Sequence, residues 1–414
     1  MRISGINRSF DIDVNLVGSK SESNRALMIG YYGGFKPRVT NISTSDDTVL
    51  LSEIINKIRV ETECTSSPQD AIIIDCHNAG TVFRFLATAL SFRIGDYILT
   101  GSDRMMQRPV GELADALRKM GAEIEYAGND GFPPLKIRGK NIVETHGRAS
   151  LPIHIDITRS SQFASSILLA LPVVELRHVT SLHLDGDLSS LPYIDMTIDM
   201  MQKFGIDVHR DKRDIFIQPS DYQDIEYTIE SDWTCASYWY EIVAFSENGR
   251  VRLHNLRLDS TQGDAVVAKW FEDFGVKSVQ DGNDVIIEKS VETFRETSQN
   301  VNKQVLQFDF INNPDLYPTI AATCAGLGIE GHFTGLRNLK HKESDRVAAM
   351  TTELSRVQTH GRASLQIVFD SHNDHRIAMA LAPLAMKIGV IEINNADVVS
   401  KSYPKFWTEF FKLL

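Results

Sequence analysis

Amphipathic helical segments followed by two short alternating strands recur along the chain. The clearest copies read "LADALRKMGAEIEYAGNDGFPPLKIRG", "IDMTIDMMQKFGIDVHRDKRDIFIQPS" and "DAVVAKWFEDFGVKSVQDGNDVIIEKS". Apolar residues recur first at helical spacing and then at every second position, as in a half-buried strand. Gly121, Gly205 and Gly275 stand at the helix ends, where a glycine readily takes the left-handed conformation of a C-cap. The pattern predicts three units of a helix followed by a hairpin.

Two looser copies lack the capping glycine at this place. They read "DDTVLLSEIINKIRVETECTSSPQDAIIID" and "DRVAAMTTELSRVQTHGRASLQIVFD". Five copies at intervals of roughly 65 to 85 residues indicate an array of βα units with buried helices, and hence an α/β protein. Because each copy is expected to end in a hairpin instead of one crossover strand, a single doubly wound sheet is disfavoured.

A second pattern places a short polar cluster directly before an apolar helix. It occurs in "GSKSESNRALMIG", "NAGTVFRFLATAL", "RSSQFASSILLALP", "NNPDLYPTIAATCAG", "HKESDRVAAM" and "NDHRIAMALAPLAM". Such residues can cap a helix, or they can bind an anion at its N-terminus, and both interpretations remain open. Capping requires no cations, yet cations stand in these clusters, among them Lys20, Arg25, Arg84, Lys342, Arg346 and Arg376. We group Arg108 and Lys401, which stand elsewhere in the chain, with them as candidates for anion binding.

Composition narrows the class of protein. A chain of 414 residues predicts two domains, and 43% hydrophobic with 23% charged residues is ordinary for a soluble globular protein. The formal net charge of -11 and the absence of a long basic run argue against nucleic acid as a partner. An anionic ligand would therefore need a local cluster of cations.

Targeting and cysteine patterns point to a soluble enzyme without a structural metal. The first residues lack a continuous apolar stretch, and no segment is apolar over the roughly 18 residues that cross a bilayer, so we expect a cytoplasmic protein. Cys64, Cys76, Cys235 and Cys324 are scattered without paired or metal-type spacing. This spacing argues against a disulfide framework or a zinc site.

Two carboxylates and one histidine are candidates for proton transfer. Asp315 follows Pro314 at an expected helix start, where an acid also stabilises the helix. Glu343 fits a first helical turn with Arg346 three residues later as its partner. For His375, a capping role is favoured over catalysis. We assign Asp345 to local structure, and we expect Val347, Met350 and Leu354 to anchor their helix in the core.

Nine motifs together resemble the 5-enolpyruvylshikimate-3-phosphate synthase family in order and approximate spacing. They are "GSKSESNRAL", "NAGTVFR", "RMMQRP", "SSQF", "SSLPYI", "PDLYPT", "RNLKHKESDR", "DHRIAMA" and "KSYP", and they extend from about Gly18 to Pro404. Two positions depart from the family pattern. Phe85 stands where proline is usual, and Arg159 stands where a small or apolar residue is common.

The resemblance implies a fold of two similar domains. Each domain would consist of three βαβαββ units in an inside-out α/β barrel, with helix N-termini facing an active-site cleft between the domains. One domain would comprise residues 20–227 and the other residues 1–19 plus 228–414. The sixth unit would combine the two chain ends, and we expect a monomer.

The resemblance also implies the reaction. The family transfers the enolpyruvyl group of phosphoenolpyruvate to the 5-hydroxyl of shikimate 3-phosphate and releases phosphate, with no metal or organic cofactor. By position, the implied shikimate 3-phosphate contacts are Lys20, Ser21, Arg25, Ser160, Ser161, Gln162, Ser190, Tyr193, Asp315, Asn338 and Lys342. The implied phosphoenolpyruvate contacts are Lys20, Asn78, Gly80, Arg108, Gln162, Arg346, Arg376 and Lys401.

Proton transfer is assigned on the same basis. Glu343 would exchange the proton at the methylene carbon, and Asp315 would accept the hydroxyl proton with assistance from Lys20. Two alternatives remain. A related transferase acts on UDP-N-acetylglucosamine, but it typically carries a cysteine on a loop over its site, and "GSDRMMQRPVGEL" has none. A non-catalytic protein that binds phosphorylated metabolites would need the cations but neither acid.

Overall fold

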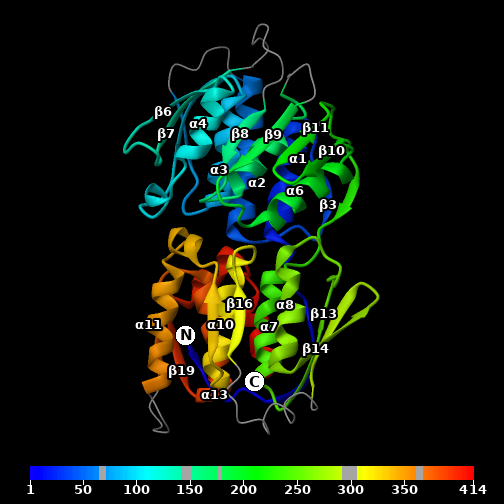
Figure 1. Ribbon diagram of the computed structural model, residues 1–414, viewed down its shortest axis with the longest axis vertical. Helices are drawn as coiled ribbons and strands as arrows, with labels where there is room; N and C mark the ends of the chain where they lie inside the picture. The colour runs from blue at the N-terminus through cyan, green and yellow to red at the C-terminus, as the bar shows by residue number, and fades with distance from the viewer. Residues whose placement is uncertain (65–70, 141–151, 175–179, 291–304, 360–366) are drawn as a thin grey trace. The chain divides into compact units, whose positions relative to one another are not determined.

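The computed structural model describes residues 1–64, 71–140, 152–174, 180–290, 305–359 and 367–414. The chain forms two compact units (Figure 1). Unit 1 contains residues 1–19, 43–46 and 230–414, and unit 2 contains residues 20–42 and 47–229. None of the described helices is long and apolar enough to cross a membrane.

Two four-stranded sheets of unit 2 have the same topology. In the first, β4 (Ile72–Asp75) is parallel to β5 (Gly95–Thr100), and β5 pairs antiparallel with β7 (Leu135–Gly139). The strand β6 (Glu123–Tyr126) completes the hairpin with β7. The second sheet has the same pairings in the order β8 (Ile153–Asp156), β9 (Thr180–Asp185), β11 (Asp214–Ile217) and β10 (Val208–Asp211). A smaller sheet pairs β3 (Arg38–Thr40) with β12 (Glu226–Thr228).

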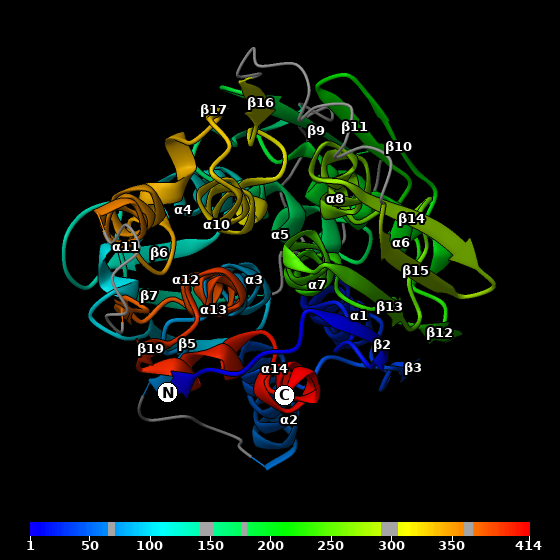
Figure 2. The ribbon, with the colours of Figure 1, turned by 90° about the horizontal axis from the view of Figure 1, so that it is seen from below.

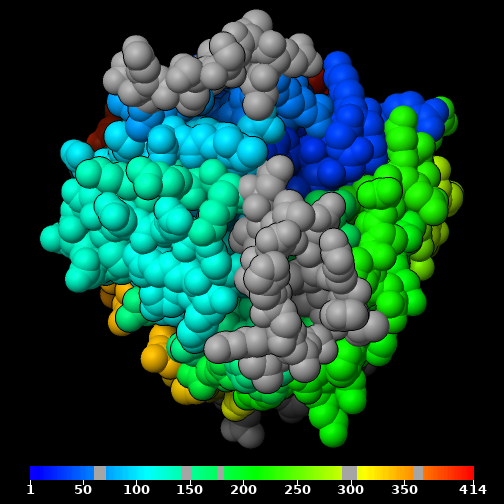
Figure 3. All heavy atoms as spheres, turned by 90° about the horizontal axis from the view of Figure 1, so that it is seen from above, coloured from blue at the N-terminus to red at the C-terminus, as the bar shows by residue number. Residues whose placement is uncertain are grey.

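The helices of unit 2 lie between these strands in the chain. They are α1 (Lys20–Tyr32), α2 (Asp46–Cys64), α3 (Gly80–Ser91), α4 (Gly111–Lys119), α5 (Gln162–Ala170) and α6 (Leu191–Lys203). In α3 and α5 nearly every residue is buried, because both sequences are apolar around most of the helix. Strand residues instead alternate between buried and exposed, so the helices fill the core and the sheets cover it. The face of unit 2 in Figure 3 shows blue residues next to cyan and green ones, so segments from early and late in this unit reach that surface.

Unit 1 contains a third sheet with this topology. In it, β2 (Ser9–Val14) is parallel to β13 (Asn248–Leu253), which pairs antiparallel with β15 (Asp284–Lys289) in a hairpin with β14 (Val276–Asp281). Two further sheets are smaller. One pairs β16 (Leu306–Asp309) with β17 (Gly331–Thr334), and the other has the order β1 (Arg2–Ile3), β19 (Ile391–Asn394) and β18 (Ile367–Asp370).

Buried helices form the core of unit 1 as well. Every residue of α7 (Trp233–Phe245) and α12 (His375–Leu381) is buried, as is most of α10 (Tyr317–Leu327). In Figure 2 these helices are seen nearly end-on, with β13, β14 and β15 to one side. Other helices of unit 1 are α11 (Arg346–Thr359), α13 (Ala385–Ile388), α14 (Phe406–Phe410), and the 3₁₀ helices η4 (Pro314–Leu316), η5 (Arg337–His341) and η7 (Ala396–Lys401).

The predicted hairpins are confirmed at all three of the clear copies, and the predicted continuous helices are confirmed at two of them. The capping glycines also have the expected positive φ: 97° at Gly121, 89° at Gly205 and 76° at Gly275. One helix was predicted wrongly as continuous. It is divided into η2 (Gly263–Val266), α8 (Val267–Trp270) and η3 (Phe271–Phe274). The 3₁₀ turn brings the buried Phe271 and Phe274 rings to 5.1 Å, since residues three apart align in that helix.

The two looser copies have a helix followed by one described strand. They are α2 with β4 and α11 with β18. The residues in between, 65–70 and 360–366, lie outside the described part, so the hairpins predicted there stay predictions. The described residues form six separate sheets of two to four strands each. This agrees with the prediction that the chain does not form a single doubly wound sheet, for the part of the chain that the structure describes.

Candidate active site

Unit 1 gathers three carboxylates and three cations. Asp315 lies in η4, and Lys342 and Glu343 lie in the turn before α11. Arg346 is the first residue of α11, while Asp374 and Arg376 lie at the start of α12. The sequence separates η4 from α12 by about sixty residues, and the packing of α10 against α11 and α12 brings them together. We call these six residues the charged cluster.

Arg346 is the centre of the charged cluster, and its side chain is only 1% exposed. Its guanidinium donates to Asp315 Oδ1 at 2.7 Å and to Glu343 Oε2 at 2.9 Å. Two further bonds, of 2.8 and 3.2 Å, go to the carboxylate of Asp374. Burial alone would lower the pKa of Arg346, but the three carboxylates raise it, Asp374 most strongly. The guanidinium is therefore held charged and fixed in orientation.

Asp315 accepts from three cations. Arg376 Nη2 is 2.8 Å from its Oδ2, and Arg346 Nη1 and Lys342 Nζ are 2.7 and 3.2 Å from its Oδ1. Burial would raise the pKa of Asp315, but the cations, with Arg376 first, hold it well below its usual range. Asp315 is thus an ionised carboxylate at neutral pH, in the state that a proton acceptor requires.

Asp374 was not predicted as a site residue. It is fully buried, and it accepts from Ser344 Oγ at 3.0 Å and from the Arg376 backbone N–H at 3.1 Å. The second bond makes Asp374 the N-cap of α12. A sequence signal existed, because Asp precedes an apolar helix here, but that signal indicates a cap alone. Its bonds to Arg346 depend on the tertiary fold.

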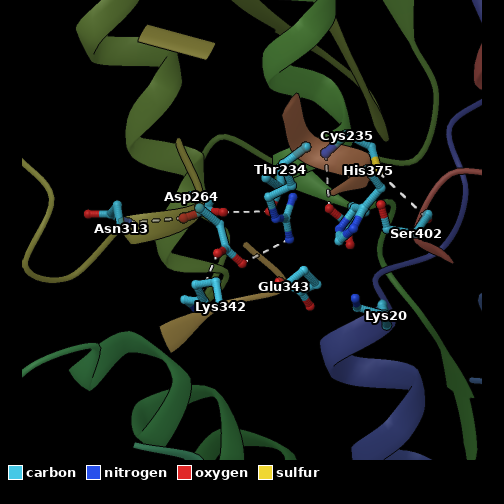
Figure 4. A network of polar contacts seen from close by, with 12 residues as sticks. Lys20, Thr234, Cys235, Asp264, Asn313, Lys342, Glu343, His375 and Ser402 are labelled. Atoms are coloured by element: carbon cyan, nitrogen blue, oxygen red, sulfur yellow. Dashed lines mark hydrogen bonds and ion pairs between the residues drawn. The ribbon is translucent and has the colours of Figure 1, made fainter. Parts of the chain in front are cut away.

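A second acidic group lies next to the charged cluster (Figure 4). Asp264 accepts from Thr234 Oγ1 and, at 3.3 Å, from Asn313 Nδ2. Burial, and then the negative charge of Asp315, raise the pKa of Asp264 to about 6. Asp315 and Asp264 are therefore neighbouring acids whose pKa values are shifted in opposite directions. Sequence reasoning did not identify Asp264, which lies in a helical segment with no distinguishing motif.

The segment "HKESDRVAAM" differs in one respect from the prediction. The helix α11 begins at Arg346, so Glu343 precedes the first turn. The reason is Asp345, whose Oδ1 accepts from Ala348 N at 3.1 Å and so caps the helix. The expected structural role of Asp345 and the expected pair of Glu343 with Arg346 are both confirmed. Met350 is fully buried, with Val347 and Leu354 packed against the same core, as expected.

The capping role favoured for His375 is wrong, because Asp374 is the capping residue. His375 is the first residue of α12 and is 1% exposed, with its Nδ1 3.7 Å from Asp374 Oδ1.

Two other predicted residues of unit 1 lie in 3₁₀ helices. Asn338 is in η5, and Lys401 ends η7.

Unit 2 holds the remaining predicted residues. Arg25, on α1, is 1% exposed and donates to Thr197 Oγ1 at 2.8 Å and to the carbonyls of Ser21 and Tyr193 at 2.9 Å. Burial lowers its pKa to about 10, which leaves it charged at neutral pH. The ring of Phe85 lies 5.8 Å from the guanidinium, so this departure from the family pattern packs against Arg25. The Lys20 ammonium pairs with Asp47 at 3.2 Å.

Gln162 links two helices of unit 2. Its Oε1 accepts from Arg84 Nη1 at 2.7 Å, and its Nε2 donates to Thr81 Oγ1 at 2.8 Å. The Gln162 backbone N–H donates to Ser160 Oγ at 3.3 Å. Arg159, the other departure, is half-exposed and pairs with Glu112 at 3.3 Å.

The first residue of α3 is covered by an arginine. Gly80 lies beneath the Arg108 guanidinium, whose Nη1 donates to the Asn78 carbonyl at 3.2 Å. A helix N-terminus with a buried guanidinium over it is an arrangement that attracts an anion.

Two serines stand at helix N-termini without a capping bond from their side chains. Ser161 precedes α5, and Ser190 precedes α6 with a left-handed φ of 55°. Both are buried. Since capping does not account for these hydroxyls, the anion-binding alternative gains weight for both positions.

A family model described as EPSP synthase (3-phosphoshikimate 1-carboxyvinyltransferase) matches residues 7–410. The chain belongs to the EPSP synthase family. Among the curated relatives of this family, the 3-phosphoshikimate 1-carboxyvinyltransferase of Bacteroides fragilis strain YCH46 is 35% identical over 415 residues. That match covers 96% of this chain and 94% of the relative. The enzyme of that name from Aliivibrio fischeri strain MJ11 is 33% identical over 435 residues and covers 97% of each chain.

A solved structure shows the fold of the EPSP synthase family. The EPSP synthase of Acinetobacter baumannii matches with a TM-score of 0.71 and 22% sequence identity, covering 100% of this chain and 97% of that chain. This likeness confirms the mixed α/β fold expected from the sequence.

Proposed function

We propose that the chain transfers the enolpyruvyl group of phosphoenolpyruvate to the 5-hydroxyl of shikimate 3-phosphate and releases phosphate. The observation that carries the proposal is the match to the EPSP synthase family over residues 7–410, with the charged cluster inside it. Both substrates are anions, and the net charge of -11 means that they need a local excess of cations. The charged cluster has as many carboxylates as cations, so the excess would come from the buried Arg25 and Arg108. The reaction belongs to the shikimate pathway of aromatic amino-acid biosynthesis.

Side chains of both units are proposed to hold the substrates. Arg346 and Arg376 would bind the carboxylate of phosphoenolpyruvate, since a guanidinium matches a planar anion. The substrate would take over donors that now bond to Asp374 and Asp315. Arg108, with Gly80 and Asn78, would bind its phosphate at the start of α3, together with Gln162 and Lys401. Lys20 would contact both substrates. Shikimate 3-phosphate would contact Ser21, Arg25, Ser160, Ser161, Gln162, Ser190, Tyr193, Asp315, Asn338 and Lys342.

The proposed chemistry uses the carboxyl groups of Glu343 and Asp315 to transfer protons. Glu343 gives a proton to the methylene carbon of phosphoenolpyruvate, and the 5-hydroxyl oxygen attacks the adjacent carbon while Asp315, assisted by Lys20, accepts the hydroxyl proton. Phosphate then leaves as the new methyl group returns a proton to Glu343, which restores the enol ether. Asp315 is ionised before the attack, as a proton acceptor must be, but its low pKa makes it a weak base, which is why the proposal includes assistance from Lys20. The cations offset the charge of the two anions and orient them.

We also propose that the shared sheet topology is an internal repeat of βαβαββ units, three in each unit of the chain. Three of the described sheets support it, since each has one parallel pair followed by an antiparallel hairpin. The protein is proposed to act as a monomer. A molar mass of about 46 kDa by light scattering would agree with that, and twice this mass would contradict it.

Phosphate release tests the function directly. The purified protein is given phosphoenolpyruvate with shikimate 3-phosphate, with UDP-N-acetylglucosamine, or with no acceptor. Release with shikimate 3-phosphate alone, together with a product heavier than the acceptor by one enolpyruvyl group, is the expected result. Release with UDP-N-acetylglucosamine would assign the chain to the other transferase. Binding of both anions by calorimetry without release in any arm would indicate a binding protein.

A further inference from the structure

A group of metal-ligating side chains lies on the second sheet of unit 2, among residues that the proposed reaction does not use. His154 is on β8, and His183 and Asp185 are on the neighbouring strand β9 (Figure 1). The two strands are parallel with His154 directly opposite His183, and the ring centroids are 4.9 Å apart. Because strand residues alternate between faces, all three side chains lie on the face away from the buried Ile155 and Leu184.

The donor atoms converge at distances that suit a metal ion. His154 Nδ1 is 3.1 Å from Asp185 Oδ2, and His183 Nε2 is 3.7 Å from Asp185 Oδ1. One ligand atom from each of the three residues lies within 4.8 Å of the others. A tetrahedral ion with bonds of about 2.0 to 2.1 Å separates its ligand atoms by about 3.3 Å. Small side-chain rotations would bring all three atoms to that spacing.

A fourth residue orients one of the imidazoles. Asp214, on β11, is directly opposite His183, and its Oδ1 is 2.7 Å from His183 Nδ1. An N–H at Nδ1 that donates to Asp214 leaves the lone pair on Nε2, the nitrogen nearer to Asp185. Metal-binding histidines almost always donate the second N–H to a carboxylate, a backbone carbonyl or water, which fixes the tautomer and raises the basicity of the ligand.

The charges around the group favour a cation. Asp156 is opposite Asp185 in the register of β8 and β9, and Asp211 is opposite Asp214 in that of β10 and β11. The nearby cation Arg213 donates to the carbonyls of Leu184 and Gly186. Hydrogen bonds or ion pairs between the two histidines and these acids explain the same contacts without a metal, so the metal titration decides between the two explanations.

The same sheet provides a histidine for comparison. His209, on β10, is opposite Phe216 of β11, and its ring stacks on that phenyl ring at 5.1 Å. The group of three metal-ligating residues does not include His209. His209 lies on the same sheet and is exposed like His154, but it lacks the convergent donors, so it serves as the control.

We propose that His154, His183 and Asp185 bind one divalent transition-metal ion on the outer face of this sheet, with Asp214 orienting His183. Two imidazoles and one carboxylate suit zinc, nickel or copper, while magnesium and calcium prefer oxygen ligands. Water would complete the coordination, since the site faces solvent. The ion would join β8 and β9, and it would stabilise unit 2 without contacting any residue assigned to the reaction.

Zinc titration of the full chain, without an affinity tag and after removal of metal by chelator, tests the proposal. Calorimetry is expected to show one equivalent bound by the unchanged protein and by His209→Asn. In His154→Asn and His183→Asn the affinity should fall at least tenfold, and in Asp214→Asn by about 10- to 100-fold. Thermal unfolding of each variant without metal checks that it folds.

Two further readouts separate the site from non-specific binding. Cobalt(II) should give visible d–d absorption in the unchanged protein and in His209→Asn, but not in His183→Asn. An excess of magnesium should leave the affinity unchanged. Equal zinc affinity in His154→Asn, His183→Asn and His209→Asn, no binding by the unchanged protein, or displacement by magnesium would each overturn the proposal.

Discussion

The Arg108 guanidinium occupies the space next to Gly80 that a side chain would fill. A Cβ atom built at Gly80 would be 2.5 Å from Arg108 Nη2 and 2.6 Å from its Cζ. Both distances are far shorter than a van der Waals contact. The position at the start of α3 therefore has to be a glycine for Arg108 to cover the helix N-terminus.

Gly80→Ala should weaken the binding of phosphoenolpyruvate selectively. The methyl group would displace Arg108, and a lost hydrogen bond to a charged group costs about 1.5 to 3 kcal/mol, which corresponds to roughly 10- to 100-fold in affinity. We expect KM for phosphoenolpyruvate to rise by that factor while KM for shikimate 3-phosphate changes little. Steady-state kinetics with each substrate varied in turn measures both. Equal rises in the two KM values would indicate a general distortion instead.

Glu343→Gln should reduce turnover more than binding. The amide can still accept from Arg346 Nη2, which is 2.9 Å from Glu343 Oε2, but it carries no proton to transfer. The loss of general acid and base catalysis lowers kcat by about 10²- to 10⁴-fold. Asp345→Asn is the matched control, because asparagine caps α11 as well as aspartate does and should leave kcat near normal. A normal rate in Glu343→Gln would contradict the assignment of Glu343.

Asp315→Asn should destabilise the ligand-free protein at neutral pH. The substitution leaves Arg346, Arg376 and Lys342 with one carboxylate fewer, and breaking a buried charge pair costs about 3 to 5 kcal/mol. The pKa of Asp315 is lower in the folded state than in the unfolded state, where it is about 3.9. The stability that Asp315 contributes is therefore complete above about pH 3.9 and is lost as the pH falls further.

Urea unfolding between pH 7 and pH 3.5 measures the difference in unfolding free energy between the unchanged protein and Asp315→Asn. It should stay constant from pH 7 to pH 5 and shrink below about pH 4. A difference that is absent at pH 7, or that grows on acidification, would show that the cations do not stabilise the Asp315 carboxylate.

Local signals in the sequence were enough to predict the hairpins. The glycine at each helix end and the alternation after it are properties of a few neighbouring residues, and the positive φ of Gly121 and Gly205 follows from them. The pairing of distant strands was not predictable in this way. The strand β2 pairs with β13, which lies more than two hundred residues later in the chain, and the sequence of neither strand indicates its partner. The break of the predicted helix at η3 likewise depends on the core around Phe271 and Phe274.

The charged cluster was predictable only in part for the same reason. Asp315, Glu343 and Arg346 stand in recognisable motifs, and the structure brings them into contact. Asp374 has the signal of a helix cap, and its contact with Arg346 arises from the packing of α11 beside α12. Asp264 has no sequence signal, because its shifted pKa comes from burial and from Asp315 rather than from its neighbours in the chain.

The stability of Asp264→Asn relative to the unchanged protein should increase as the pH rises. The folded pKa of Asp264, about 6, lies above its ordinary value of 3.8, so between these values the folded state binds more protons than the unfolded state. Stability therefore falls as pH rises through this window, by about 3 kcal/mol in total. Asparagine does not titrate and avoids that loss. Unfolding free energies at pH 4 and pH 7 should show the variant gaining relative to the unchanged protein, and a gain at pH 4 alone would contradict the shift.

Glu241→Leu should raise the thermal stability of unit 1. Glu241 lies in the fully buried helix α7, and neither carboxylate oxygen has a hydrogen-bond partner among the residues that the structure describes. Burial raises the pKa of Glu241 well above its ordinary value, so the folded state loses stability as pH rises above about 4.3, the pKa of an exposed glutamate. Leucine has a similar length without the polar group, and removing an unpaired buried polar group gains about 1 to 3 kcal/mol. Calorimetric unfolding at pH 5 and pH 8 should show an increase in Tm that is larger at pH 8. A decrease in Tm at both pH values would mean that the Glu241 carboxyl stabilises the core of unit 1.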